Sequence, residues 1–388
     1  MRQFIQDPVY ILAFLCFIVF LSEWICKKSF LKHFGSSLMA ILITAIVANL
    51  GLLPSASNAS PVYGHIFSYI APIGIFYLLL SVNLKDLKKA GLPMLIMFII
   101  GSLSTVVGVT AALYLVDGPT LFGEKHFAIA GMMTGTYTGG SVNFNAVALH
   151  YDVVKEGVTY TGIVVTDNIL TALWMIAGLV LPKYMQKLLP KNKRIQEDNV
   201  SDSLEGTYSD SEQIDPGQLG LLLVLGLSVL IISDQSAAWF ASRGISVPSI
   251  LILTTIALVL AQLPVIQKLK GAKLLGMFNI LLFLAVVGAF CEISAIGNLG
   301  ELALTIIIFT SSIILVHGIT IFLIGHFIKQ DWDIVVVASQ ANIGGPSTAL
   351  ALAKSLKRPD LLLPAILVGT LGSALGTYLG FMVAEWLK

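Results

Sequence analysis

Residues 131–150 read GMMTGTYTGGSVNFNAVALH, and residues 336–355 read VVASQANIGGPSTALALAKS. Each stretch holds a glycine pair, Gly139-Gly140 or Gly344-Gly345, inside an apolar run with hydroxyl and amide side chains on both sides. In lipid, a backbone that leaves its helix must line a protein cavity, because each unpaired polar group there costs several kcal/mol. Two such breaks in corresponding halves of a chain are typical of a secondary transporter's binding site.

The composition places the chain in a membrane. Of its 388 residues, 56% are hydrophobic and only 12% are charged, far from the average of soluble proteins. The net charge of +1 gives no reason to expect nucleic acid as a partner. No P-loop, no Gly-x-Ser-x-Gly sequence and no metal-ligand or nucleophile–base spacing occurs, so we do not expect an enzyme.

Ten apolar runs have the length of about 20 residues that one membrane span requires. The two glycine-pair segments, about 126–150 and 333–356, come in addition to these spans. The ten runs lie at about 8–25, 36–53, 65–83, 92–116, 158–182, 217–233, 246–263, 273–291, 300–325 and 361–386.

Charge placement decides how the glycine-pair segments cross. If both are re-entrant hairpins, most of the 23 Lys and Arg residues fall in loops on one side, including the cluster at 183–194. By the positive-inside rule that side is the cytoplasm. We therefore expect both termini outside and the chain in the inner (plasma) membrane.

Parity then predicts two inverted repeats, residues 1–182 and 217–388, each with five transmembrane helices and one re-entrant hairpin. A weak internal similarity between residues 41–54 and 251–264 agrees with this expectation. Between the repeats, residues 183–216 are polar and their second part is acidic. Such a segment cannot bury enough apolar surface to fold alone, which indicates a flexible cytoplasmic linker.

The chain as a whole resembles the membrane proteins grouped as domain of unknown function 819. These are placed with the sodium/glutamate, citrate-type 2-hydroxycarboxylate and bile-acid-type symporters in one cation-coupled superfamily. The sequence Gly344-Gly345-Pro346-Ser347-Thr348-Ala349 is similar to the second hairpin tip of the glutamate symporters. The resemblance implies an all-α, elevator-type transporter, coupled to Na⁺ or H⁺, with a scaffold that forms a homodimer.

The chemistry of the two tips can be read independently. Helix N-termini at a break present free N–H groups and partial positive charge to a carboxylate. Two glycines permit positive φ and close approach of a ligand to the backbone. The predicted substrate-binding residues are Thr136, Thr138, Gly139, Gly140, Ser141, Asn143, Asn342, Gly344, Gly345, Ser347 and Thr348.

Asp167 lies deep in the span 158–182, directly after the first hairpin. An ionisable group at that depth costs a few kcal/mol and is functional by default. As a carboxylate it could bind Na⁺ together with amide and hydroxyl oxygens, or carry a proton. The predicted cation ligands are Asn145, Asp167, Asn168, Ser339 and Gln340. His317 is a weaker candidate for a proton relay.

No Lys or Arg lies deep in a span, so an anionic or zwitterionic solute would be held by helix ends and amides. This favours symport of a small solute with one or two carboxylates, such as an amino acid, a small peptide or an organic acid. A Na⁺/H⁺ antiporter that uses Asp167 without an organic substrate is the main alternative. A channel or an intramembrane enzyme has less support.

Overall fold

The computed structural model describes residues 5–28, 35–82, 84, 87–188, 215–245, 247–291 and 299–388, and every regular element in these ranges is helical. The main elements are α2 (Pro8–Lys28), α3 (Gly35–Asn49), α4 (Pro61–His65), η3 (Ile66–Ile70), α5 (Ala71–Leu79), α6 (Leu92–Leu115), α7 (Gly118–Phe122), α8 (His126–Gly139), α9 (Ser141–His150), α10 (Gly157–Leu188), α11 (Pro216–Ala241), α12 (Ser249–Ala261), α13 (Pro264–Gln267), α14 (Ala272–Ala289), α15 (Leu299–Phe327), α16 (Trp332–Ser355) and α17 (Leu362–Leu387).

Eight helical segments of the described chain are long and apolar enough to cross a membrane, and α3 and α12 are shorter apolar helices. These ten helices lie at the positions of the ten apolar runs in the sequence. The prediction of a polytopic helical membrane protein is confirmed, with eight helices of full spanning length in the described part of the chain. One boundary differs from the expectation. Residues 183–188, assigned to the linker, continue α10 as helix, and residues 189–214 lie outside the described part of the chain.

The outward faces of the long helices are apolar. Phe20 in α2, Leu227 in α11 and Ile319 in α15 are 62%, 51% and 67% exposed. Water would penalise such a surface, whereas hydrocarbon does not. Lipid is therefore the surrounding that this exterior requires.

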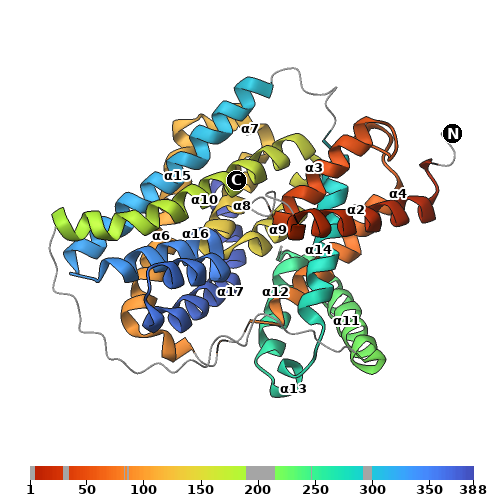
Figure 1. Cartoon of the computed structure of the whole chain (residues 1–388). Helices are drawn as coiled ribbons and strands as arrows, with labels where there is room; N and C mark the ends of the chain where they lie inside the picture. The colour runs from red at the N-terminus through yellow and green to blue at the C-terminus, as the bar shows by residue number, and fades with distance from the viewer. Residues whose placement is uncertain are drawn as a thin grey trace.

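The helices pack as two groups (Figure 1). In the first, called the α14 group, α14 packs on α2, α3 and α5, while α12 packs on α5 and α11. In the second, called the α16 group, α6 packs on α15, α8 on α17, and α16 on α10 and α17. Smaller contacts, such as α10 with α14 and α12 with α17, join the groups.

The first glycine-pair segment folds back on itself at Gly140. This residue interrupts the helix with φ 104° and ψ 176°, between α8 and α9. Positions at equal distances before and after Gly139 face each other. A Cβ at Gly131 would lie 3.3 Å from Val147 Cγ1, and one at Gly135 would lie 3.2 Å from the Asn143 carbonyl carbon. Helices α8 and α9 are therefore antiparallel neighbours.

The second segment, α16, folds back in the same way at Gly345, where φ is 74°. A straight helix of its 24 residues would separate its ends by about 36 Å. Instead, Arg358 just beyond its C-terminus donates to Asp331 and Asp333 at its N-terminus, over 3.0 and 2.7 Å. This ion-pair cluster, the α16 clasp, holds the two arms of α16 together at their base.

The α16 clasp gives a stability prediction. Arg358→Met leaves Asp331 and Asp333 facing each other with side chains only 21% and 23% exposed. Because the clasp is partly solvated, we expect the free energy of unfolding to fall by about 2 kcal/mol, less than for the loss of a fully buried ion pair. Thermal unfolding in detergent measures it. The exposed Lys354→Ala on the same arm is the control and should change stability by less than about 0.5 kcal/mol. Equal effects of the two variants would contradict a clasp.

Candidate functional site

The tips of the two folded-back segments meet inside the protein. A Cβ placed on Gly345 would lie 3.6 Å from the Gly139 carbonyl oxygen and 3.9 Å from Gly140 Cα. The Asn342 side-chain amide reaches the same place, with one of its terminal atoms 3.5 Å from the Thr138 carbonyl oxygen. Two segments about 205 positions apart in the sequence thus bring four glycines and their interrupted backbones together.

A cavity of about 240 Å³ opens beside this contact. The α16 group provides one wall through α8, α9, α10 and α16, and the α14 group provides the other through α3 and α14. Its lining residues are Ser37, Thr136, Gly140, Ser141, Phe144, Asn145, Tyr160, Val164, Asp167, Asn168, Thr171, Ile280, Leu284, Ile343, Gly344 and Thr348.

Half of the site residues predicted from sequence line this cavity. They come from both tips and from α10. They are Thr136, Gly140, Ser141, Asn145, Asp167, Asn168, Gly344 and Thr348. Asp167 is the only acidic side chain among the described lining residues, and no described lining residue is Lys or Arg.

The other predicted residues support the tips from behind. Asn143 accepts from Thr377 over 2.8 Å and donates to the Gly372 carbonyl over 3.3 Å, which fixes α9 to α17. Thr138 donates to the Thr134 carbonyl in its own helix. Gly139 allows α17 to approach, because a Cβ there would lie 1.9 Å from the Gly372 carbonyl carbon.

In the second tip, Asn342 meets the Ser102 hydroxyl of α6 at 2.9 Å. Gln340 is fully buried behind Gly344. Gly345 makes the tip contact itself, while the exposed Ser347 lies outside the cavity wall. The structure therefore separates residues that face the cavity from residues that hold its walls in place.

Ser339 belongs to a buried hydrogen-bond chain. Its hydroxyl accepts from Trp174 Nε1 over 3.0 Å and meets His317 Nε2 at 2.9 Å. The other ring nitrogen, Nδ1, lies 3.0 Å from the Thr105 hydroxyl, and that hydroxyl donates to the Tyr137 carbonyl over 2.9 Å. This chain connects the second segment with the backbone just before the first glycine pair, and occupies both nitrogens of His317.

Sequence reasoning missed Tyr137 and Thr171. Thr171 stands one helical turn after Asp167 in α10, and its hydroxyl donates to Asp167 Oδ1 over 3.3 Å. The Tyr137 hydroxyl faces the same carboxylate from α8. The i, i+4 spacing of a hydroxyl from a buried acid was visible in the sequence, since residues four apart share a helix face. Nothing in the sequence placed Tyr137 toward Asp167.

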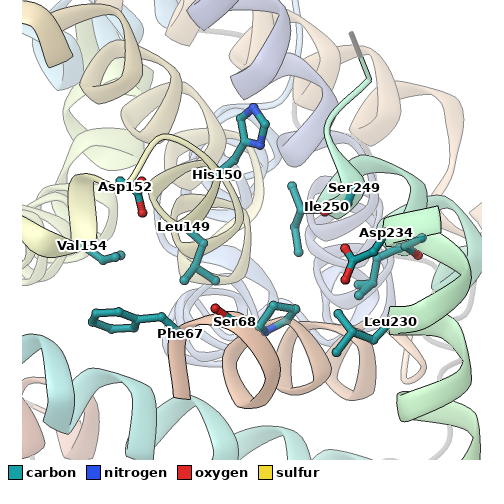
Figure 2. A pocket seen from close by; sticks show the side chains of 13 residues that line it. Phe67, Ser68, Leu149, His150, Asp152, Val154, Leu230, Asp234, Ser249 and Ile250 are labelled. Atoms are coloured by element: carbon teal, nitrogen blue, oxygen red, sulfur yellow. The ribbon is translucent and has the colours of Figure 1, made fainter. Parts of the chain in front are cut away.

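A second cavity of about 310 Å³ also lies between the two groups. Figure 2 shows Leu149 in the last turn of α9 and Asp152 just beyond that helix on one side, with Asp234 of α11 and Ile250 of α12 on the other. Phe67 and Ser68 of the π-helix η3 form its floor. None of the site residues predicted from the sequence lines this cavity. The cavity is a second gap between the α14 and α16 groups.

Fold and site define a class of protein: a polytopic helical membrane protein with a polar cavity where two interrupted segments meet. Residues 10–388 match the family "Protein of unknown function (DUF819)", and the chain belongs to that family. It is also similar to the "Uncharacterized membrane protein YjcL" of Bacillus subtilis (strain 168). The two are 28% identical over 368 residues, which cover 91% of this chain and 90% of the relative. The expected family membership is confirmed.

The backbone at Gly140 yields a second stability prediction. A Cβ there would meet no atom within 4 Å, so Gly140→Ala tests the positive φ alone, with an expected cost of about 1–3 kcal/mol. Gly64→Ala in α4 is the matched control, because its Cβ is also free and its φ is not positive. That control should stabilise the protein by up to about 1 kcal/mol. Thermal unfolding of both variants measures these changes. If the stability of the Gly140→Ala protein equals that of the wild type, the interrupted tip is contradicted.

Proposed function

We propose that the protein is a secondary active transporter that couples uptake of a small carboxylate-bearing solute to Na⁺ or H⁺. The observation that carries the proposal is the cavity at the meeting point of the two glycine tips, with Asp167 in its wall. A pair of interrupted segments around a polar cavity is the arrangement that secondary transporters use for their binding sites.

Helix contacts support an inverted repeat. The pair α3–α14 has its counterpart in α12–α5, the pair α2–α3 in α11–α12, and the pair α8–α17 in α16–α10. The helices α6 and α15, which occupy equivalent positions, pack on each other. Such paired contacts are expected when two halves with the same helix order are related by a twofold axis in the membrane plane.

In the proposed orientation the folded-back segments are re-entrant hairpins, the termini lie outside, and the segment that joins α10 to α11 is cytoplasmic. This arrangement keeps the basic cluster after residue 182 on the cytoplasmic side. The membrane is the inner (plasma) membrane, and the protein acts as a homodimer.

Binding would use the first residues of α9. Ser141 lies in the cavity wall directly after Gly140, where N–H groups of a new helix and its dipole favour a carboxylate. Hydroxyls of Thr136 and Thr348 extend this polar surface. Because the cavity wall contains a carboxylate and no basic side chain, a cation or proton at Asp167 lets an anionic solute bind beside it.

Both cavities lie between the α14 group and the α16 group. This arrangement supports an elevator motion, in which the α16 group carries the site across the membrane past a fixed α14 group. Packed helices exchange between discrete arrangements instead of deforming continuously, and a polar gap between the groups leaves room for that exchange.

A Na⁺/H⁺ antiporter is the second candidate function. It is favoured by the single acidic side chain in the described cavity wall, because one carboxylate that binds either Na⁺ or H⁺ suffices for exchange. In that case the polar tips would only complete the cation site.

Uptake into proteoliposomes tests the function. We expect an inward NaCl or proton gradient to accelerate uptake of at least one compound from a panel of radiolabelled amino acids, dipeptides and mono- and dicarboxylates. Asp167→Asn should lower the coupled rate at least tenfold, whereas Asp117→Asn, in the loop before α7, should leave it unchanged. A pH-sensitive dye response to Na⁺ alone, without solute uptake, would select the antiporter. If neither response is observed, both functions are rejected.

Cross-linking across the second cavity tests the elevator motion. In a background with the three native cysteines replaced, Asp152→Cys on the α16 group and Asp234→Cys on the α14 group face the same cavity. A bifunctional cross-linker between them should abolish uptake, because the groups can no longer slide. The control pair Asp234→Cys with Ser249→Cys joins α11 to α12 within the α14 group and should leave uptake intact. Full uptake by the first cross-linked pair would exclude the motion.

A further inference from the structure

Two fully buried polar side chains lie next to the cavity. Gln340 and Tyr137 are both 0% exposed. Among the described residues, neither amide atom of Gln340 has a hydrogen-bond partner, and the Tyr137 hydroxyl meets only the Asp167 carboxylate and the Thr171 side chain. An unsatisfied buried polar group destabilises the folded state, and proteins rarely keep one without a purpose.

Both side chains point to one place. A Cβ on Gly344 would lie 2.6 Å from Gln340 Nε2, 2.3 Å from Thr348 Oγ1 and 3.0 Å from Thr171 Cγ2. Thr171 in turn donates to Asp167, and the Tyr137 hydroxyl faces that same carboxylate. Side chains of α8, α10 and α16 therefore converge on a small volume at the cavity wall.

We infer that Asp167, Tyr137, Thr171, Gln340 and Thr348 together bind one alkali cation, with Na⁺ as the coupling ion. The inference rests on the proposed function and narrows it from Na⁺ or H⁺ to Na⁺. It also changes the ligand set expected from the sequence, since Tyr137, Thr171 and Thr348 replace Asn145, Asn168 and Ser339.

The donor set suits a hard monovalent cation. All five side chains offer oxygen, which Na⁺ shares with other hard cations as its preferred ligand. The hydroxyls of Thr171 and Thr348 already donate their protons to Asp167 and to the Gly345 carbonyl, so their lone pairs are free. One carboxylate among neutral oxygens balances a single positive charge and leaves a divalent ion undercompensated.

Two residues predicted as cation ligands are already engaged. The oxygen of Asn145 accepts from the Tyr160 hydroxyl, and Ser339 is held between Trp174 and His317. Asn168 stays in the cavity wall, with its amide nitrogen donating to the Val164 carbonyl over 2.7 Å. These contacts hold the tips in position, and the oxygens of the five proposed ligands bind the cation.

Gln340 links the ion to the solute. Its amide has an oxygen for the cation and an N–H₂ group beside Gly344, at the cavity wall. A cation that fixes the oxygen orients the two donors toward a carboxylate in the cavity. Binding of the ion then prepares the solute site, which is the thermodynamic reciprocity that coupling requires.

Thermal unfolding of the purified protein in NaCl and in choline chloride, at equal ionic strength, tests the site. A ligand that binds only the folded state raises Tm, and for the wild type we expect a rise on the order of 2 °C. Gln340→Met and Tyr137→Phe remove the two polar groups without changing the shape greatly. Both variants should lose the Na⁺-dependent rise, yet Gln340→Met should unfold at a higher Tm than the wild type in choline.

The matched control is Thr254→Val in α12. Its hydroxyl is also fully buried and has no hydrogen-bond partner among the described residues, but it lies in the α14 group away from the site. This variant should raise Tm in choline and keep the full Na⁺-dependent rise. Such a pattern separates ion binding from a general gain in stability.

The outcomes separate the inference from the proposed function. If the Na⁺-dependent rise survives in Gln340→Met and Tyr137→Phe, the ion binds elsewhere and the inference is wrong. If the wild type shows no rise but takes up solute in a proton gradient, the function holds and the Na⁺ site is wrong. If no gradient drives uptake or exchange, the proposed function fails even where a Na⁺-dependent rise is found.

Discussion

The contact between the two glycine tips is the constraint on which the rest of the structure depends. Each tip ends a helix in the middle of the protein and leaves backbone groups without helical partners, which lipid would not tolerate. Gly139, Gly140 and Gly345 let the two backbones approach within van der Waals distance, so each tip shields the other. The helices α10 and α17 pack against the opposite segment and hold both tips in register.

A structure of this kind needs polar contacts that stabilise without filling the cavity. Asn143, Asn342 and Ser339 serve this purpose, because each joins a tip segment to a neighbouring helix. In the cavity wall, the Thr348 hydroxyl keeps its lone pairs for a ligand, whereas the Asn145 oxygen accepts from Tyr160. Position relative to the tip, and not residue type, thus distinguishes a support from a binding group.

Much of the fold was predictable from the sequence because lipid restricts a spanning chain to helices of known length. The ten apolar helices, the two interruptions and the location of Asp167 followed from that restriction. The site was predictable only in outline. Asn145 and Gln340 looked equivalent in the sequence, yet Tyr160 satisfies the first and no described residue satisfies the second. Such partners depend on rotations of α8, α10 and α16 about their axes, which apolar runs without a strong periodicity do not specify.

The helix α10 has a mechanical consequence. It runs without interruption from Gly157 to Leu188, about 48 Å for its 32 residues, while the hydrocarbon layer is about 30 Å thick. Asp167 in the first half of α10 and the start of the linker at the far end therefore belong to a single continuous helix. Any displacement of the cavity along the membrane normal must move the exposed end of this helix by the same amount. A label near Leu188 would therefore report the depth of the buried site in the membrane.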